Sequence, residues 1–441
     1  MLKKTWFLSS LLFVVSLEAA DYECKNKFND NELLNEMVVK RLREADVDAN
    51  LCFCGCLDFS AMFINQTERK DKDGSVASLQ GDANLKYLQK HDGYGFGCEM
   101  GVKTRSGIIK SGRAMLDSSF LFVESDFIGL AKFGYTNTAA DAFSICGDNV
   151  LVGYRGAGSG NLHYLYNASS WSIVGTGFTF DDDRAAKISW RSPVVSGSSV
   201  GLSFTPDSRD ANLFKTNHDE EIQEPCGKEN FAGSTAYSKN IITAGVAYEW
   251  GAPDDFNAKF SIGGWFGKGK PGCRNSGSIE VRNVRAYNVG AILGYKDLKI
   301  SLGYVDNGKS LLSTKYATEE MASFDPNRTY KLDDPDVGIK SDADAGKMYS
   351  IGVAYVFDKL VASAGYFRSE VKFSPSEKAK ADIITLAVQR EFSEALSFYM
   401  EYDNINTSTC DRALAYGAAC EQSVVGKNRA NAVIIGMKFN F

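Results

Sequence analysis

The sequence predicts an all-β protein that forms a transmembrane β-barrel, and three observations lead to that prediction. From Leu51 to Phe441, apolar residues alternate with small or polar ones in stretches of about 8 to 13 residues, the period of a two-faced strand. Sixteen such stretches can be counted, and short connections between them alternate with long ones. An even number of two-faced strands joined in this way is typical of a closed barrel in a membrane.

The last stretch shows the pattern clearly. Val433, Ile435 and Met437 share one face, whereas Ala432 and Gly436 lie on the other. A soluble β-sandwich also has two-faced strands, but its sheets rarely contain so many of them. The candidate strands lie at 51–65, 77–88, 93–105, 114–123, 127–135, 184–192, 199–206, 240–250, 256–267, 284–293, 298–306, 347–357, 360–371, 380–390, 395–403 and 430–441.

The connections support the same interpretation. Short ones lie at 124–126, 251–255 and 358–359, and the long ones lie near 136–183, 207–239, 307–346 and 404–429. All 8 prolines fall in or beside a connection. Proline cannot donate a ladder hydrogen bond, and a closed barrel has no edge strand that would accept one.

Composition excludes several classes of protein. The chain has 441 residues, 44% of them hydrophobic, and a formal net charge of −6. After the N-terminus no apolar run approaches the ~20 residues of a spanning helix, which excludes a helical membrane protein. No basic stripe suggests a nucleic-acid partner.

The N-terminus predicts secretion. Lys3 and Lys4 precede an apolar stretch from Trp6 to Leu17, and Ala19 and Ala20 follow, so residues 1–20 are expected to be a signal peptide. Residues 21–50 are expected to form a periplasmic leader with a short helix, in which Leu34, Val38 and Leu42 recur every fourth residue. The barrel domain is expected to occupy 51–441.

Two internal stretches and the C-terminus resemble the Gram-negative porin family. The stretches are FVESDFIGLAKFGYTNT at 122–138 and KISWRSPVVSGSSVGLSFTP at 187–206, and the chain ends on Phe441 in an alternating strand. The resemblance implies a sixteen-stranded antiparallel barrel in the outer membrane of a Gram-negative bacterium, usually a homotrimer. It also implies a third loop folded into the lumen, passive diffusion of small hydrophilic solutes and ions, outer-membrane lipid as a partner, and Phe441 as a signal for assembly.

The connection at 136–183 is the longest, and we expect it to fold inward and narrow the channel. Asp141, Asp148 and Arg155 are its candidate constriction residues. The candidate basic residues of the pore wall are Lys86, Lys103, Arg105, Lys132, Lys187 and Arg191. Opposite charges across a narrow aqueous gap would create a transverse field that favours small polar solutes. The alternative is that these charges are solvated wall with no role in selection. Tyr135 stands where such porins often carry a pore-facing arginine, which leaves selectivity open.

The 10 cysteines predict disulfides, since the periplasm and cell surface are oxidising. Cys410 with Cys420, and Cys226 with Cys273, are the candidate pairs in the outer loops. Cys52, Cys54 and Cys56 lie about 7 Å apart at each step of an extended strand, so all three cannot hold one metal ion. An acidic loop with Asp333, Asp334, Asp336, Asp342 and Asp344 favours a hydrated surface over a calcium site.

Nothing in the sequence predicts an enzyme or a cofactor. The 3 histidines, His91, His163 and His218, are scattered, and no spacing joins His163 to Ser159 or Ser170 as a hydrolase would require. Two other functions remain alternatives to a diffusion channel: a structural or adhesive surface barrel with a plugged lumen, and a substrate-specific channel.

Overall fold

A computed structural model describes most of the predicted barrel domain. The described residues are 49–67, 74–91, 93–106, 114–154, 185–208, 236–251, 256–271, 281–310, 344–372, 378–410 and 425–441. The predicted signal peptide and all but the last two residues of the predicted leader lie outside these ranges, as does the leader's expected helix.

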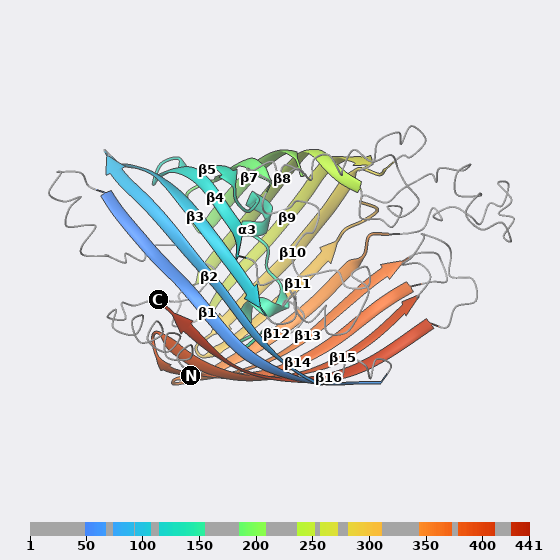
Figure 1. Ribbon diagram of the computed structural model, residues 1–441. Helices are drawn as coiled ribbons and strands as arrows, with labels where there is room; N and C mark the ends of the chain where they lie inside the picture. The colour runs from blue at the N-terminus through green and yellow to red at the C-terminus, as the bar shows by residue number, and fades with distance from the viewer. Residues whose placement is uncertain are drawn as a thin grey trace, which may run out of the picture.

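The described strands form one closed antiparallel barrel, as predicted (Figure 1). Each strand pairs with the next in sequence, and β16 pairs with β1. The strands are β1 (Ala49–Gln66), β2 (Gly74–His91), β3 (Tyr94–Ser106), β4 (Ala114–Ser125), β5 (Gly129–Tyr135), β6 (Ala186–Arg191), β7 (Ser198–Asp207), β8 (Ala236–Gly251), β9 (Phe256–Pro271), β10 (Val284–Tyr295), β11 (Leu298–Asp306), β12 (Lys347–Phe357), β13 (Leu360–Lys372), β14 (Lys378–Ser393), β15 (Leu396–Cys410) and β16 (Val425–Asn440).

The C-terminal residue helps to close the ring. Phe441 and Gly55 exchange two backbone hydrogen bonds of 2.8 and 3.0 Å, which extends the ladder between β1 and β16 by one pair. The Phe441 ring packs against Phe53, 5.5 Å between centroids, and lies where any side chain at position 55 would stand. Closure leaves no free sheet edge, the condition for a strand assembly to be stable in lipid.

Short turns are confined to one end of the barrel, here called the turn end, and the opposite end is called the loop end. The turns at Lys296-Asp297 and Asp358-Lys359 join β10 to β11 and β12 to β13. Lys296 and Asp358 have φ of 51° and 54°. Two-residue hairpin turns need positive φ because their twist must match that of the strands.

The two faces of the wall differ as the alternation predicts. Large apolar side chains such as Phe59, Ile262 and Leu386 are about half exposed on the outward face. The inward face carries Gly, Ala, Ser and Thr over much of its height, together with charged residues on some strands. The outward face is therefore suited to hydrocarbon, as in other membrane barrels.

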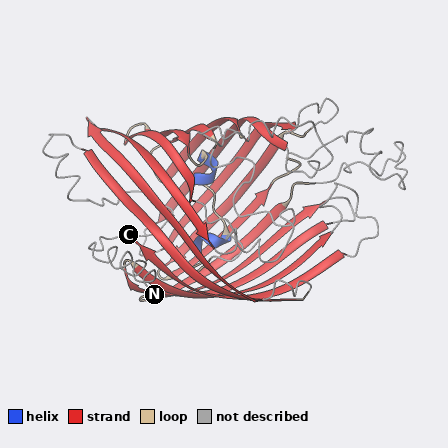
Figure 2. Ribbon diagram, in the orientation of Figure 1, coloured by secondary structure: helices blue, strands red, loops and turns tan. Residues whose placement is uncertain are grey.

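Two short helices follow β5: α3 (Ala139–Ala142) and the 3-10 helix η2 (Gly147–Val150). Figure 2 shows both within the ring of strands. No helix in the described ranges is long and apolar enough to cross a membrane.

The prediction of a loop over 404–429 is wrong at both ends. β15 continues to Cys410 and β16 begins at Val425, and the two strands stay paired up to that point. The apolar alternation stops there, because Asn404, Asn406 and Ser408 occupy the outward positions that apolar residues hold earlier in the strand. Side-chain hydrogen bonds from Asn404 and Tyr402 to Asn431, 2.7 and 2.8 Å long, help to hold this part of the ladder.

Candidate functional site

The inward face of β7 to β13 carries a row of glycines, here called the glycine track. Its members are Gly201, Gly245, Gly263, Gly290, Gly303, Gly352 and Gly365. Register pairs them in three groups: Gly201 lies opposite Gly245, which lies opposite Gly263; Gly290 lies opposite Gly303; and Gly352 lies opposite Gly365. Neighbouring groups are offset from each other by two residues. Without side chains, these positions let another segment approach the strand backbone closely.

Residues 136–154, here called the inner segment, lie along this track. The Phe143 ring packs over Gly201 and Gly245, Ile145 over Gly290, and Leu151 over Gly365. Gly147 itself meets Gly352, backbone to backbone. A Cβ atom at these track positions would collide with the segment, so the glycines are what permits it to lie so close to the wall.

Hydroxyl groups beside the track bind the backbone of the inner segment. The amides of Gly147 and Val152 donate to Ser350 Oγ and Ser363 Oγ, at 2.8 and 3.1 Å. Ser301 Oγ donates to the Cys146 carbonyl oxygen at 2.5 Å. A buried backbone group without a partner is costly, so these serines stabilise a segment that forms little secondary structure of its own.

Charged groups anchor the two ends of the inner segment. At its start, the buried Lys187 donates from Nζ to the Thr136 carbonyl oxygen at 2.6 Å. At its end, the Tyr154 amide donates to Glu401 Oε2 at 2.7 Å, and Lys438 Nζ donates to the Gly153 carbonyl oxygen at 2.6 Å. Hydrogen bonds to charged groups each contribute about 1.5–3 kcal/mol.

The wall across from the track, β2 to β6, carries charges at inward positions. Lys132 interacts electrostatically with Glu99, Arg191 and Lys86, and Glu99 also interacts with Lys86. Lys86 Nζ lies 5.0 Å from the Phe122 ring centroid, and Lys132 Nζ lies 4.5 Å from that of Phe120. The two rings are buried beneath the ammonium groups and orient them by cation–π attraction.

The other predicted wall residues do not join this cluster. Lys103 forms an ion pair of 2.5 Å with Asp117 on the neighbouring strand β4, and its side chain is 47% exposed. Lys187 anchors the inner segment, as described above. The backbone of Arg105 pairs with Gln80 in β3, and its side chain is not among those described.

Two of the three predicted constriction residues lie in the inner segment. Asp141 is in α3, where its Oδ2 accepts from Thr138 Oγ1 at 2.7 Å while its amide donates to the same hydroxyl at 3.1 Å. It therefore belongs to the N-terminal cap of α3. Asp148 is half-buried in η2. Arg155 lies outside the described residues.

The predicted disulfides also fall outside the described part of the chain. Cys420, Cys226 and Cys273 lie there, and only the backbone of Cys410 is described. Among the described residues, Cys52, Cys54, Cys56 and Cys98 are free thiols, and the Cys146 thiol contacts Ser144 Oγ at 4.0 Å. Burial, followed by the nearby Asp148 carboxylate, raises the pKa of the Cys146 thiol to about 12.

Towards the loop end, the inward face becomes apolar on the strands from β8 round to β1. Met62, Ile434, Ile405, Trp265 and Met348 share this region, and each is at most 1% exposed. These residues form part of one buried hydrophobic cluster. We call this region the apolar collar.

Sequence reasoning did not identify the glycine track or the anchors Glu401 and Lys438. The signal was available in part, because Gly245 and Gly352 lie on the small faces of strongly alternating strands. Their alignment across strands depends on register, which one sequence does not specify.

Comparison with known proteins agrees with this geometry. The model of a family described as Gram-negative porin matches residues 53–409. A protein of Rickettsia bellii (strain RML369-C) is 23% identical over 367 residues, which are 74% of this chain and 76% of that protein. A protein of Rickettsia prowazekii (strain Madrid E) is 25% identical over 250 residues, 46% of this chain and 56% of the relative.

Two solved structures share the fold. Salmonella typhi OmpF in complex with daunomycin matches with a TM-score of 0.56 and 12% identity, covering 89% of this chain and 98% of OmpF. The anion-selective porin from Comamonas acidovorans matches with a TM-score of 0.53 and 14% identity, covering 89% of this chain and 100% of that porin.

Proposed function

Because the chain belongs to the Gram-negative porin family, we propose that this outer-membrane β-barrel is a water-filled channel for the passive diffusion of small hydrophilic solutes and ions. One observation carries the proposal: the inner segment is bound to the β7–β13 wall, while charged side chains occupy the β2–β6 wall. Charged side chains at inward positions are costly unless water or opposite charges reach them. The 47% exposure of Lys103 supports a wetted interior on that side.

The same arrangement supports a charge-based selection of solutes. Asp141 and Asp148 belong to the inner segment, and Lys86, Lys132 and Arg191 belong to the wall strands β2, β5 and β6. In the proposed channel the segment is the inward-folded third loop, and the two groups of charges flank the path of the solute. A transverse field of this kind orders water and disfavours apolar solutes.

We further propose that the protein is secreted with residues 1–20 as its signal peptide and assembles as a homotrimer. The lengths of two neighbouring strands support assembly: β5 and β6 have 7 and 6 residues. A tilted strand needs about 9–11 residues to span the hydrocarbon. A wall this short is better covered by another protein surface than by lipid.

A second candidate is a structural or adhesive surface barrel with a plugged lumen. The apolar collar favours it, because large inward-facing apolar side chains at 0–1% exposure are unusual for a wall that lines water.

Single-channel recording in a planar bilayer under a salt gradient tests the first proposal. The purified, correctly folded protein should produce discrete conductance steps, and the reversal potential should give the charge preference. Liposome swelling in sugars separates the second candidate, since a plugged barrel admits no sugar. A folded protein that gives neither steps nor swelling would eliminate the diffusion channel.

A further inference from the structure

Two neighbouring turns at the turn end form an exposed apolar surface, here called the turn patch. It consists of Phe127 and Ile128 in the turn from β4 to β5, and of Val194 and Val195 in the turn from β6 to β7. Phe127 is 87% exposed, and Val194 and Val195 are 64% and 66% exposed. Large apolar side chains that are exposed together mark a surface that another segment or molecule covers.

The two turns of the patch are held against each other. Trp190, near the end of β6, donates from Nε1 to the Ile128 carbonyl oxygen at 2.8 Å. A side chain at Gly129 would collide with the backbone at 191–193, so the first turn lies directly against the chain that leads into the second. Val195 also exchanges two backbone hydrogen bonds of 2.9 Å across its own turn. The patch is therefore preformed, which lowers the entropy cost of covering it.

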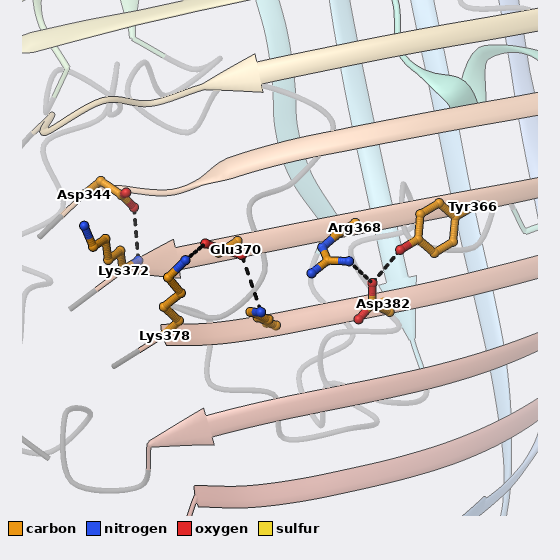
Figure 3. Close-up of polar contacts among 8 residues, drawn as sticks. Asp344, Tyr366, Arg368, Glu370, Lys372, Lys378 and Asp382 are labelled. Atoms are coloured by element: carbon orange, nitrogen blue, oxygen red, sulfur yellow. Dashed lines mark hydrogen bonds and ion pairs between the residues drawn. The ribbon is translucent and has the colours of Figure 1, made fainter. Parts of the chain in front are cut away.

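The turn patch differs from other parts of the barrel rim, which carry charge. At the same end, the turns after β10 and β12 are Lys296-Asp297 and Asp358-Lys359. At the loop end, outward side chains of β13 and β14 pair with each other, and Arg368 Nη1 lies 3.7 Å from Asp382 Oδ1 (Figure 3). Charge suits a rim that meets water and headgroups, so the apolar composition of the turn patch needs a separate reason.

The lipid boundary does not supply that reason. Exposed positions at the turn end elsewhere carry rings with a polar group, such as Trp250 and Tyr295, which favour the boundary between hydrocarbon and headgroups. An exposed phenylalanine at this end packs on the wall, since the Phe357 ring centroid lies 4.3 Å from that of Tyr355. The turn patch instead combines Phe127 with aliphatic side chains, which have no particular preference for this boundary.

The chain that leads into β1 starts close to the patch. β1 begins at Ala49, and register connects Ala49 across β2, β3 and β4 to Ala131 near the start of β5 (Figure 1). Four spacings between neighbouring strands separate β1 from β5, a distance of about 19 Å. Residues 43–48 can span about 20 Å when extended. The part of the leader before them can therefore reach the patch.

The expected leader helix has an apolar face of its own to bury. Residues 30–42, here called the leader helix, lie outside the described part of the chain, and their sequence places Leu34, Val38 and Leu42 on one face. A helix of this length is marginal in water unless tertiary packing covers its apolar face. The leader helix and the turn patch each need a cover that the other can provide.

Charge favours one orientation of the leader helix on the patch. Lys40, Arg41 and Arg43 surround Leu42 in the sequence, and Asp126 is exposed beside Phe127. A helix that docks with its C-terminal end towards the first turn brings these opposite charges together. Exposed pairs of this kind add little affinity but select an orientation.

We propose that the leader helix docks on the turn patch and covers it. A second copy of this chain is the weaker candidate, because the short tether holds the leader at an effective concentration in the millimolar range, whereas a second copy must first associate. The patch belongs to turns beyond the wall, so the outward faces of β5 and β6 stay accessible to other copies. The proposal goes beyond solute diffusion and does not depend on whether the barrel conducts.

Photo-crosslinking of the secreted, membrane-inserted protein tests the contact. The photoreactive residue p-benzoyl-phenylalanine replaces Phe127, and cross-linked peptides are identified by mass spectrometry. Cross-links should join position 127 to residues 30–42. The same replacement at Phe357, which is 55% exposed at the turn end, should give none to the leader. Cross-links from position 127 mainly to lipid, or to barrel residues of another copy, would overturn the proposal, as would a mature chain that lacks residues 30–42.

Limited trypsin digestion measures how firmly the helix docks. The basic residues at 40–43 provide cleavage sites that a docked helix protects. The double variant Phe127→Ser and Val195→Ser should be cleaved there about tenfold faster than the wild type, because proteolysis follows the population of the open form. The matched control Phe357→Ser and Leu360→Ser changes two exposed apolar side chains at another turn and should be cleaved at the wild-type rate. Equal acceleration in both variants, or in neither, contradicts docking on the patch.

A change in the leader itself completes the test. Val38→Ser should also accelerate cleavage, because it removes part of the apolar face without touching the barrel. Combined with Phe127→Ser, it should add little further acceleration, since both changes break the same contact. Effects that multiply independently would show that the leader helix and the patch do not meet. If the serine variants of the turns do not fold, the cross-linking result alone decides.

Discussion

The β2–β6 and β7–β13 walls of this barrel share one architecture but carry different inward residues. On β7–β13, glycine and serine accept the inner segment, and backbone groups meet backbone groups. On β2–β6, Lys86 and Lys132 flank Glu99 over buried aromatic rings, and Arg191 lies near Lys132. The difference shows how one closed sheet can hold a constricting element on one side and keep charge on the other.

The outward face of the barrel also differs between these two groups of strands. The strands that hold the inner segment also carry most of the outward charges at the loop end, such as Lys268, Arg285 and Lys347, whereas β1–β6 carry no described outward charge there. In a proposed trimer, the uncharged sector with the short strands β5 and β6 suits contact with other copies.

The largest expected effect concerns the reactivity of Cys146, which the inner segment holds against the wall. A thiol whose pKa is raised from 9.0 to about 12 has a thiolate fraction about a thousandfold lower near neutral pH. Alkylation of Cys146 by iodoacetamide should therefore be slower in the folded protein than in the denatured protein, by up to that factor. Peptide mapping by mass spectrometry measures both rates. Equal rates would mean that the segment leaves the wall readily.

The second-largest effect is expected for a substitution in the glycine track. In Gly352→Val the new side chain would collide with the Gly147 backbone, lifting the inner segment and destabilising the fold by about 3 kcal/mol. Single-channel conductance should rise, and the unfolding midpoint in denaturant should fall. Gly264→Val, on the outward face of β9, is the matched control and should leave conductance unchanged. An unchanged conductance in Gly352→Val would contradict the role of the track.

A smaller effect is expected at the anchor near the end of the segment. Lys438→Met removes the 2.6 Å hydrogen bond to the Gly153 carbonyl oxygen and a cation–π contact with Tyr399, together about 2 kcal/mol. Current recordings should show more rapid closures, because this part of the segment moves more freely. Lys427→Met, on the outward face of the same strand, should show the same rate of closures as the wild type. An equal rate of closures in both variants would show that Lys438 is dispensable for anchoring.

The smallest effect concerns charge selection. Lys132→Gln removes one positive charge from the β2–β6 wall, and at about 10 Å in water this changes the energy of a passing ion by roughly 0.4 kcal/mol. The ratio of anion to cation permeability should fall up to about fourfold, because the anion loses an attraction and the cation loses a repulsion of that size. The reversal potential in a salt gradient measures this ratio. Lys359→Gln, in a turn, should leave the ratio nearly unchanged. If the reversal potential of Lys132→Gln equals that of the wild type, the Lys132 charge is solvated by water and has no role in ion selection.

Local alternation was sufficient to predict most of the strands. The predicted bounds of β11 and β12 agree with the structure to the residue, because these strands alternate cleanly between clear turn signals. The ends of β15 and β16 were missed, since polar residues at 404, 406 and 408 interrupt the outward apolar face and the strand is held there by pairing across the ladder. Of the predicted wall residues, Lys86, Lys132 and Arg191 cluster, while Lys187 anchors the inner segment.

The sequence by itself determined the all-β class, the sixteen strands and the face on which each residue of a strand lies, because these depend on a period of two and on local turn chemistry. Only the tertiary structure decided which inward residues meet. The alignment of seven glycines from seven strands, the capture of 136–154 by that row and the pairing of Glu401 with the Tyr154 amide all depend on strand register and on contacts between residues hundreds of positions apart. Such contacts leave no periodic signal in a single chain.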